Sequence, residues 1–346
     1  MKLAVVSAVL LALMAFLARP SHREADDFHA FYDSAKLSGT GTMYKATEHG
    51  GRFLPYLRIP SYALMLRPLT LFSYETARCI WIGLLVLAFL GFVTLWPQGG
   101  PRLLLALTAS MPVLYSFQLG QDIALILLIV AAAVRLDLSG RHFAAGLAIS
   151  LIAIKISFLI PIALVFAVRS RRAAMGAAIG VAAQMGISFA LEGWRWPVLY
   201  LAVLRSPGLD PSPSTIPSVR GLVNALPFAP AIVVCAALGT YVVIAWIARR
   251  SDLVTAVSVA MAGAMIAAPH TLAYDAVLCL PLFVSVAGLS NWTGRLALLG
   301  VTPVPYLLLC GEMVPGRYAA ISLILISVVL ASRHHTAGVL APSTAQ

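Results

Sequence analysis

Long apolar runs alternate with short charged or Pro/Gly-rich breaks along the whole chain. A bilayer core about 30 Å thick takes about 20 apolar residues of helix. The runs Ile123–Val134 and Ile156–Val168 are shorter, so we expect some short, steeply packed or partly re-entrant helices. The pattern predicts an all-α, polytopic transmembrane helical bundle of about 12 helices, at residues 3–19, 76–96, 102–116, 122–135, 142–155, 157–168, 173–191, 226–248, 252–268, 275–289, 295–310 and 318–332.

The longest polar break, residues 20–75, separates the first two predicted helices and forms the first outer loop. Its later part, residues 54–72, is amphipathic and interrupted by three prolines, which is typical of juxtamembrane helices lying in the interface. A true membrane span there is the alternative, and it would invert every later helix. A second long outer segment, Glu192–Asn224, holds two tryptophans suited to an interfacial belt.

The chain shows no internal repeat and no region whose composition differs from the rest. Residues 1–346 are therefore predicted to form a single integral membrane domain. Residues 334–346 are predicted to be a disordered C-terminal tail. Residues 3–19 are predicted to be an uncleaved first helix. A cleaved signal peptide is the alternative, disfavoured by a weak cleavage pattern and by Pro20.

The composition agrees with a membrane protein. The chain is 60% hydrophobic and 11% charged, whereas soluble domains carry about 25% charged residues. The net charge of +11 would suggest nucleic acid in a soluble protein, but here arginines mark helix ends, so no nucleic-acid partner is expected. The four cysteines form no CxxC pair and indicate neither a zinc site nor a disulfide framework.

The basic residues sort by membrane side when the N-terminus is placed inside and helix ends are counted alternately. Eleven of them then lie at inner ends and five in short outer loops, as the positive-inside rule requires. Both termini are therefore predicted to be cytoplasmic in a multi-pass protein of the cell membrane. The inner set is Lys2, Arg102, Arg135, Arg141, Arg169, Arg171, Arg172, Arg249, Arg250, Arg295 and Arg333.

On this topology the other polar residues gather on the outer face, which predicts a one-sided cavity there. Polar groups at membrane depth are costly and so are usually functional. The adjacent carboxylates of Asp26 and Asp27 stand out, since the chain holds only 13 acidic residues. Helix capping is an alternative role for this pair. Other candidates are Tyr32, Tyr44, Arg52, Tyr56, Arg58, Gln118, Gln121, Lys155, Arg220, His270, Tyr274 and Asp275.

Several short motifs in order along residues 20–290 resemble glycosyltransferase family 87, whose members are polytopic GT-C enzymes related to polyprenyl-phosphate-mannose-dependent mannosyltransferases. The motifs are Asp27-Phe-x-x-Phe-Tyr, Met43-Tyr44, Pro55-Tyr with Arg67-Pro-Leu, Gly120-Gln121, Ala145-Gly-Leu with Lys155 and Pro161, Arg169-Ser-Arg-Arg, and Pro269-His-x-x-x-Tyr-Asp. Each motif alone is unspecific, and the ordered set carries the resemblance. It implies a bundle of GT-C type.

The resemblance also implies a reaction. A sugar, mannose or another hexose, would pass from a polyprenyl-phosphate donor to a lipid or glycan acceptor on the outer face. An aspartate soon after the first helix would act as general base; Asp27 fits that place, and Asp26 is the alternative. Arg52, Arg58, Arg220, His270 and Lys155 would stabilise the leaving phosphate.

The neutral polar candidates fill the remaining roles in this interpretation. Gln118 and Gln121 would bond sugar hydroxyls, because amides both donate and accept hydrogen bonds. Tyr32, Tyr44 and Tyr56 would stack on the sugar or the lipid phosphate. Tyr274 and Asp275 belong to the same outer cluster, where Asp275 alternatively caps the helix that follows it.

Two other function classes compete with the enzyme. A secondary transporter or lipid flippase would show internal repeats and ionisable residues at the midplane, and neither is seen. A structural or assembly protein would lack a cavity around Asp27. We expect no cofactor and assign no metal ligands, although Asp26, Asp27, His29 and Asp33 carry donor atoms that a divalent metal accepts.

Overall fold

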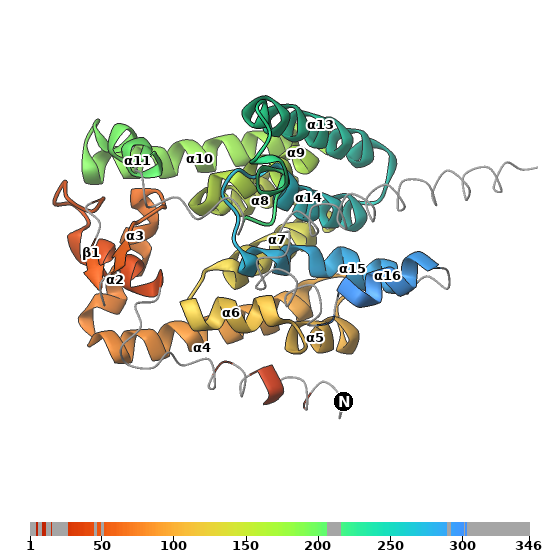
Figure 1. Cartoon of the computed structure of the whole chain (residues 1–346), viewed down its shortest axis with the longest axis horizontal. Coiled ribbons are helices and arrows are strands. Elements are labelled where there is room, and N and C mark those ends of the chain that lie inside the picture. The colour runs from red at the N-terminus through yellow and green to blue at the C-terminus, as the bar shows by residue number, and fades with distance from the viewer. Residues whose placement is uncertain are drawn as a thin grey trace, which may run out of the picture.

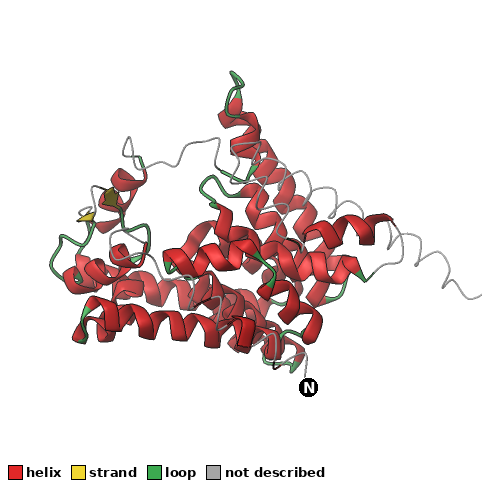
Figure 2. Ribbon diagram, turned by 60° about the horizontal axis from the view of Figure 1, so that its bottom comes forward, coloured by secondary structure: helices red, strands yellow, loops and turns green. Residues whose placement is uncertain are grey.

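The computed structural model describes residues 27–44, 47–49, 52–205, 216–288 and 292–300, together with positions 5, 9–11, 15 and 302. The fold is a bundle of α-helices with one short β-hairpin (Figures 1 and 2). The hairpin, β1 (Thr47–His49) with β2 (Arg52–Leu54), pairs antiparallel and lies at one edge of the molecule. The sequence pattern did not predict it.

The first part of the described chain holds α2 (Asp27–Leu37), α3 (Pro60–Leu66), the 3-10 helix η1 (Arg67–Leu71) and the long α4 (Tyr74–Leu95). The middle holds α5 (Pro101–Thr108), α6 (Met111–Leu119), α7 (Ile123–Leu138), α8 (His142–Ser150), η2 (Leu151–Lys155), α9 (Ile156–Arg169) and α10 (Arg171–Glu192). The last part holds α11 (Trp196–Leu204), α12 (Val219–Val223), α13 (Ala229–Arg250), α14 (Leu253–Ala267), η4 (Ala273–Cys279), α15 (Leu280–Ala287) and α16 (Trp292–Gly300).

Four helical stretches of the described chain are long and apolar enough to cross a membrane: Tyr74–Leu95, His142–Arg169, Arg171–Glu192 and Ala229–Arg250. The bent pair α5 and α6 would make a fifth. The chain is therefore a helical membrane protein, but the expected count of about 12 spanning helices is not confirmed. Most of the predicted helix 3–19, part of 295–310 and all of 318–332 lie outside the described residues.

The single helix predicted at 102–116 was wrong. Two helices, α5 and α6, meet there at 62°. Pro112 stands in the first turn of α6, where it cannot donate a backbone hydrogen bond and its ring would clash with the carbonyl four residues earlier. The helix therefore ends at Thr108 and restarts at Met111.

The stretch His142–Arg169 folds back on itself at Lys155, where the backbone leaves helical geometry with φ −129° and ψ 86°. A straight helix of this length would separate its ends by about 40 Å. Instead His142 and Arg169 line the same pocket. The two helices predicted at 142–155 and 157–168, with Lys155 in the turn between them, describe this segment better than one long span does.

Glycines allow α8 and α10 to lie unusually close together. A Cβ at Gly146 would stand 2.0 Å from the carbonyl oxygen of Ala173, and one at Gly176 would stand 2.2 Å from that of Phe143. Gln184 farther along α10 donates to the carbonyl of Ser150 at 2.8 Å. The contacts advance in the same direction on both helices, so α8 and α10 run parallel with their N-termini at the same end.

This packing separates the polar residues into two ends of the bundle. At one end, which we call the arginine end, the pocket lined by Asp137, His142, Arg169 and Arg249 joins the ends of α7, α8, α9 and α13. At the other end lie the start of α2, the α6–α7 turn, the Lys155 turn and η4. We call this second end the Asp27 end.

Candidate active site at the Asp27 end

Asp27 is the first residue of α2, where a carboxylate is stabilised by the positive end of the helix. Its side chain is partly exposed. The side-chain amide Nε2 of Gln121 donates a hydrogen bond to Oδ2 of Asp27. The chain thus brings together two predicted site residues from distant parts of the sequence. Asp26, the alternative base, lies outside the described residues.

Gln121 is held in place by a tight turn between α6 and α7. Gly120 caps α6 in the left-handed conformation, with φ +69°. Its carbonyl accepts a 2.7 Å hydrogen bond from Nε1 of Trp81 on α4. A Cβ at Gly120 would stand 2.8 Å from the Cβ of Phe28. Glycine is therefore needed both for the backbone conformation and for the close approach of α2, which carries Asp27.

Arg58 and Asp122 form a buried ion pair beside Gln121. Arg58 Nε lies 2.8 Å from Asp122 Oδ2 and Nη2 lies 3.0 Å from Oδ1, which is a bidentate arrangement. The side chains are only 8% and 0% exposed. Burial alone would raise the pKa of Asp122, but the Arg58 guanidinium holds it below its ordinary value. Both groups are therefore charged near neutral pH.

Arg58 also reaches the amide of Gln121, since Nη2 lies 3.3 Å from Oε1. A guanidinium only donates hydrogen bonds, so the amide oxygen must face Arg58 and the amide nitrogen must face Asp27. The side chains form a chain of contacts from Asp122 through Arg58 and Gln121 to Asp27. We call these four residues the Asp27 relay.

Lys155 and Asp275 form a second buried ion pair at the same end. Nζ of Lys155 bonds Oδ1 of Asp275, and the backbone N–H of Leu272 donates to Oδ2 at 3.0 Å. The ammonium also lies 4.9 Å from the ring centre of Tyr274. Lys155 interacts electrostatically with Asp122. The second pair therefore belongs to the same cluster as the Asp27 relay.

Tyr274 joins the two parts of the cluster. Its hydroxyl interacts electrostatically with the carboxylates of Asp275, Asp27 and Asp122. The side chain is buried and its ring packs against that of Tyr115 at 6.0 Å between centroids. Carboxylates from α2, the α6–α7 turn and η4 thus all interact electrostatically with one tyrosine.

Arg220 and His270 meet beside this cluster. Nη1 of Arg220 donates to the carbonyl of Pro269 at 3.1 Å and lies 3.5 Å from Nδ1 of His270. Both side chains are partly exposed. His270 is four residues from Tyr274 along the same segment. The pair thus offers cationic and hydrogen-bonding groups that a ligand can reach, unlike buried Arg58.

The other predicted site residues are placed differently. Tyr32, Tyr44 and Tyr56 are buried, and their hydroxyls donate to the backbone carbonyls of Phe72, Arg58 and Ile59 at 2.6, 2.8 and 3.2 Å. In this structure their hydrogen bonds stabilise the backbone near α2 and Arg58. Gln118 is exposed, and its backbone carbonyl accepts from Arg78 at 3.2 Å. The side chain of Arg52 lies outside the described part of the chain.

Asp122 is the site residue that sequence reasoning missed, because an aspartate after Gly120-Gln121 is also typical of a turn before a helix. The sequence feature that could have identified Asp122 is its position directly before the apolar run of α7. Among the described residues, no group of three or more His, Cys, Asp or Glu side chains is placed to hold a metal ion. The cluster consists of ion pairs and amide contacts.

The chain matches Glycosyltransferase family 87 over residues 56–281. That range includes Arg58, Gln121, Asp122, Lys155, Arg220, His270, Tyr274 and Asp275. Asp27 precedes it. No curated protein and no solved structure matches the chain. Since the matched range covers well over half of the sequence and holds most of the cluster, the chain belongs to glycosyltransferase family 87.

Proposed function

We propose that this membrane glycosyltransferase moves a sugar from a polyprenyl-phosphate donor to a hydroxyl of a lipid or glycan acceptor, with Asp27 as general base. Mannose or another hexose is the proposed sugar. The observation that carries the proposal is the partly exposed carboxylate of Asp27, oriented by Gln121 at the charged end of a helical membrane protein of family 87. Because the opposite end is rich in arginine, we place the Asp27 end on the outer face of the cell membrane.

The proposed step is a single displacement. The acceptor oxygen forms a bond to the anomeric carbon while the bond from that carbon to the phosphate oxygen breaks. Asp27 takes the proton of the acceptor hydroxyl, and the bonding electrons leave with the polyprenyl phosphate. One displacement inverts the anomeric configuration. The product should therefore have the configuration opposite to that of the donor.

Asp27 is the best base among the carboxylates of the cluster. Asp122 and Asp275 are 0% and 1% exposed and are each bound to a cation. A buried, cation-paired carboxylate is a poor proton acceptor and cannot reach a hydroxyl. Asp27 is partly exposed, so an acceptor hydroxyl can reach its carboxylate, which the amide of Gln121 orients.

Gln121 is then a positioning residue rather than a sugar ligand. Gln121 is 3% exposed, and its amide bonds Asp27 on one side and Arg58 on the other. Arg58 is in turn fixed by two hydrogen bonds to Asp122. The Asp27 relay therefore supports the base through groups that themselves have little freedom to move, as a precise catalytic geometry requires.

The leaving phosphate is assigned to Arg220 and His270. Cations and N–H donors near a leaving phosphate stabilise the charge that develops in the transition state. Arg58 and Lys155 are engaged in buried ion pairs. Arg220 and His270 are partly exposed and in contact with each other. This pair can approach a phosphate without breaking a buried ion pair.

The central test is the Asp27→Asn variant. General base catalysis contributes about 10²–10⁴-fold, so transfer should fall by that factor while expression and thermal unfolding in detergent stay unchanged. Asp33→Asn is the matched control, because Asp33 lies on the same helix outside the Asp27 relay. Full activity of Asp27→Asn would exclude Asp27 as the base and would direct attention to Asp26.

The donor is tested separately with purified protein in lipid. Polyprenyl phosphates carrying mannose, glucose or a pentose are supplied in turn, with a lipid extract as acceptor source, and release of free polyprenyl phosphate is measured. Consumption of the mannose or the glucose donor, but not of the pentose donor, would support the proposed hexose. If none of these donors is consumed under conditions where the protein is folded, the polyprenyl-phosphate proposal is wrong.

A further inference from the structure

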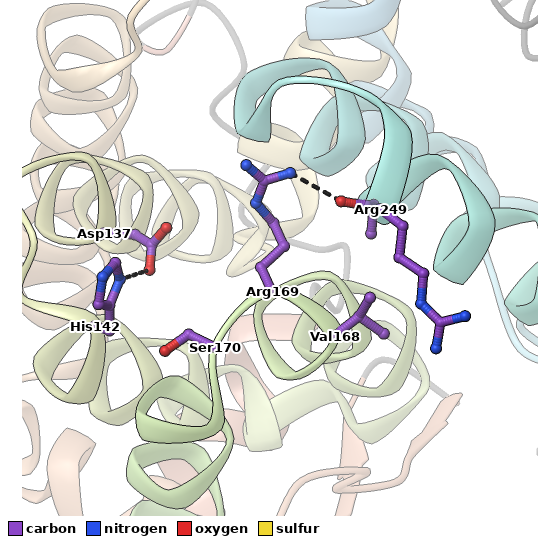
Figure 3. A pocket seen from close by; sticks show the side chains of 7 residues that line it. Asp137, His142, Val168, Arg169, Ser170 and Arg249 are labelled. Atoms are coloured by element: carbon purple, nitrogen blue, oxygen red, sulfur yellow. Dashed lines mark hydrogen bonds and ion pairs between the residues drawn. The ribbon is translucent and has the colours of Figure 1, made fainter.

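A pocket of about 400 Å³ lies at the arginine end, away from the Asp27 relay (Figure 3). Its lining residues come from four helices and one turn: Asp137, His142, Val168, Arg169, Ser170, Ala248 and Arg249. A cavity of this size is within the range of small-ligand sites. The proposed sugar transfer at the Asp27 end gives this pocket no role.

The charge of the lining is positive. Oδ1 of Asp137 lies 2.6 Å from Nδ1 of His142, so that carboxylate is already engaged (Figure 3). Arg169 and Arg249 are exposed and carry the remaining charges of the lining. The lining therefore holds two arginines and one carboxylate, and that carboxylate has a partner.

Arg169 has hydrogen-bonding capacity to spare. Its Nη1 donates to the backbone carbonyls of Ala248 (Figure 3) and Ser251, both at 2.8 Å, and so caps the end of α13. A guanidinium has five N–H donors. Within the described part of the chain, no acceptor is recorded for those on Nε and Nη2 of Arg169. These donors are fixed near the pocket by the two capping bonds.

Arg249 supplies a second guanidinium at the end of α13. Its side chain extends away from Arg169 (Figure 3), and no acceptor for it is recorded among the residues that the structure describes. An exposed arginine changes rotamer within nanoseconds, so this group can turn toward an anion. Arg250, its neighbour, does not line the pocket and instead lies 4.9 Å from the ring centre of Trp246.

The backbone reinforces this preference for an anion. Ser170 is the N-cap of α10, and His142 is the first residue of α8. Because the two helices run parallel, the positive ends of both border the pocket. The opposing carbonyls at the end of α13 are capped by Arg169. Two helix N-termini and the guanidinium of Arg169 therefore border one cavity, and Arg249 also lines it.

We propose that this pocket binds a phosphate-bearing anion, supplied either by the headgroup of an acidic phospholipid or by free phosphate. Arginine matches phosphate with paired hydrogen bonds, and basic pockets between membrane helices are suited to anionic headgroups. The proposal goes beyond sugar transfer and does not depend on it, because none of the pocket residues belongs to the Asp27 relay.

The test uses the full chain in nanodiscs of phosphatidylcholine with and without phosphatidylglycerol, with bound lipid measured by native mass spectrometry. Arg249→Gln is the test variant. Arg250→Gln is the matched control, since it removes the same charge from the neighbouring residue, which does not line the pocket. Loss of a charge-assisted hydrogen bond should weaken phosphatidylglycerol binding about tenfold in Arg249→Gln, with a much smaller effect in Arg250→Gln.

Inorganic phosphate, titrated into discs with and without phosphatidylglycerol, separates the two sources. Competition between phosphate and phosphatidylglycerol would indicate a site for the phosphate group itself, and phosphatidylglycerol binding unaffected by phosphate would indicate a lipid site. Equal weakening by Arg249→Gln and Arg250→Gln would mean that only the general positive charge attracts lipid. That result, or the absence of any anion binding to the unmodified protein, would overturn the proposal.

Discussion

The two ends of this bundle use charged side chains in opposite ways. At the Asp27 end, Arg58 and Lys155 are largely buried and each is bound to a carboxylate. At the arginine end, Arg169 and Arg249 are exposed. Burying a charge has a desolvation cost that only close pairing offsets, whereas an exposed arginine keeps its hydration. The buried pairs therefore specify a rigid local geometry, and the exposed arginines remain available to lipid or ligand.

The largest effect on folding should come from breaking the buried pair. Arg58→Met leaves the buried carboxylate of Asp122 without its partner, and removing one member of such a pair costs about 3–5 kcal/mol. We expect that loss in the free energy of unfolding, measured by denaturant titration in detergent. Arg172→Gln, at an exposed position of the arginine end, should change it by less than about 0.5 kcal/mol.

A double variant makes this comparison sharper. Arg58→Met combined with Asp122→Leu removes both charges and should recover most of the lost stability, because no uncompensated charge stays buried. If Arg58→Met and Arg172→Gln proved equally mild, the contrast between the two ends would not be energetic.

The next largest effect should be on catalysis, through the Asp27 relay. Gln121→Leu removes the donor that orients Asp27, and we expect transfer to fall about 10–100-fold through kcat, with little change in KM. Gln98→Leu, an exposed glutamine between α4 and α5, is the control. Loss of a donor disfavours the charged carboxylate, so the acid limb of the pH–rate profile should move to higher pH. An unchanged profile with raised KM would instead support a sugar-binding role for Gln121.

The smallest effect should appear as a pH dependence of stability. Arg58 lowers the pKa of Asp122 in the folded protein, so the ion pair stabilises the fold above the unfolded value of about 3.9. That contribution is lost as the pH falls through the lowered folded value. The unmodified protein should therefore lose stability in acid more steeply than Asp122→Asn does. Parallel slopes for the two proteins, followed by thermal unfolding, would contradict this assignment.

Much of the fold follows from the order of apolar and polar residues. The helix predicted at 76–96 is Tyr74–Leu95, and the one predicted at 252–268 is Leu253–Ala267. The break at Pro112 was missed, although a proline inside an apolar run is a visible signal. The helices α11 and α12 were also missed, because short segments in long loops lack an extended apolar pattern.

For the site, the sequence supplied the residue types but not their roles. It singled out Asp27, Gln121, Lys155 and Asp275 as rare polar groups, and the structure places them in one cluster. It did not show that Gln121 bonds Asp27 rather than standing beside it. The three predicted stacking tyrosines were chosen by residue type alone, and their hydroxyls are bonded to nearby backbone carbonyls.

The sequence by itself determined that this is a helical membrane protein, because hydropathy and local periodicity depend only on near neighbours. The tertiary structure alone decided which charges pair. The contacts of Asp122 with Arg58, Asp27 with Gln121, and Lys155 with Asp275 join residues 64, 94 and 120 positions apart. Such pairings depend on how whole helices pack, and no local pattern in the chain shows which residues far apart in sequence come into contact.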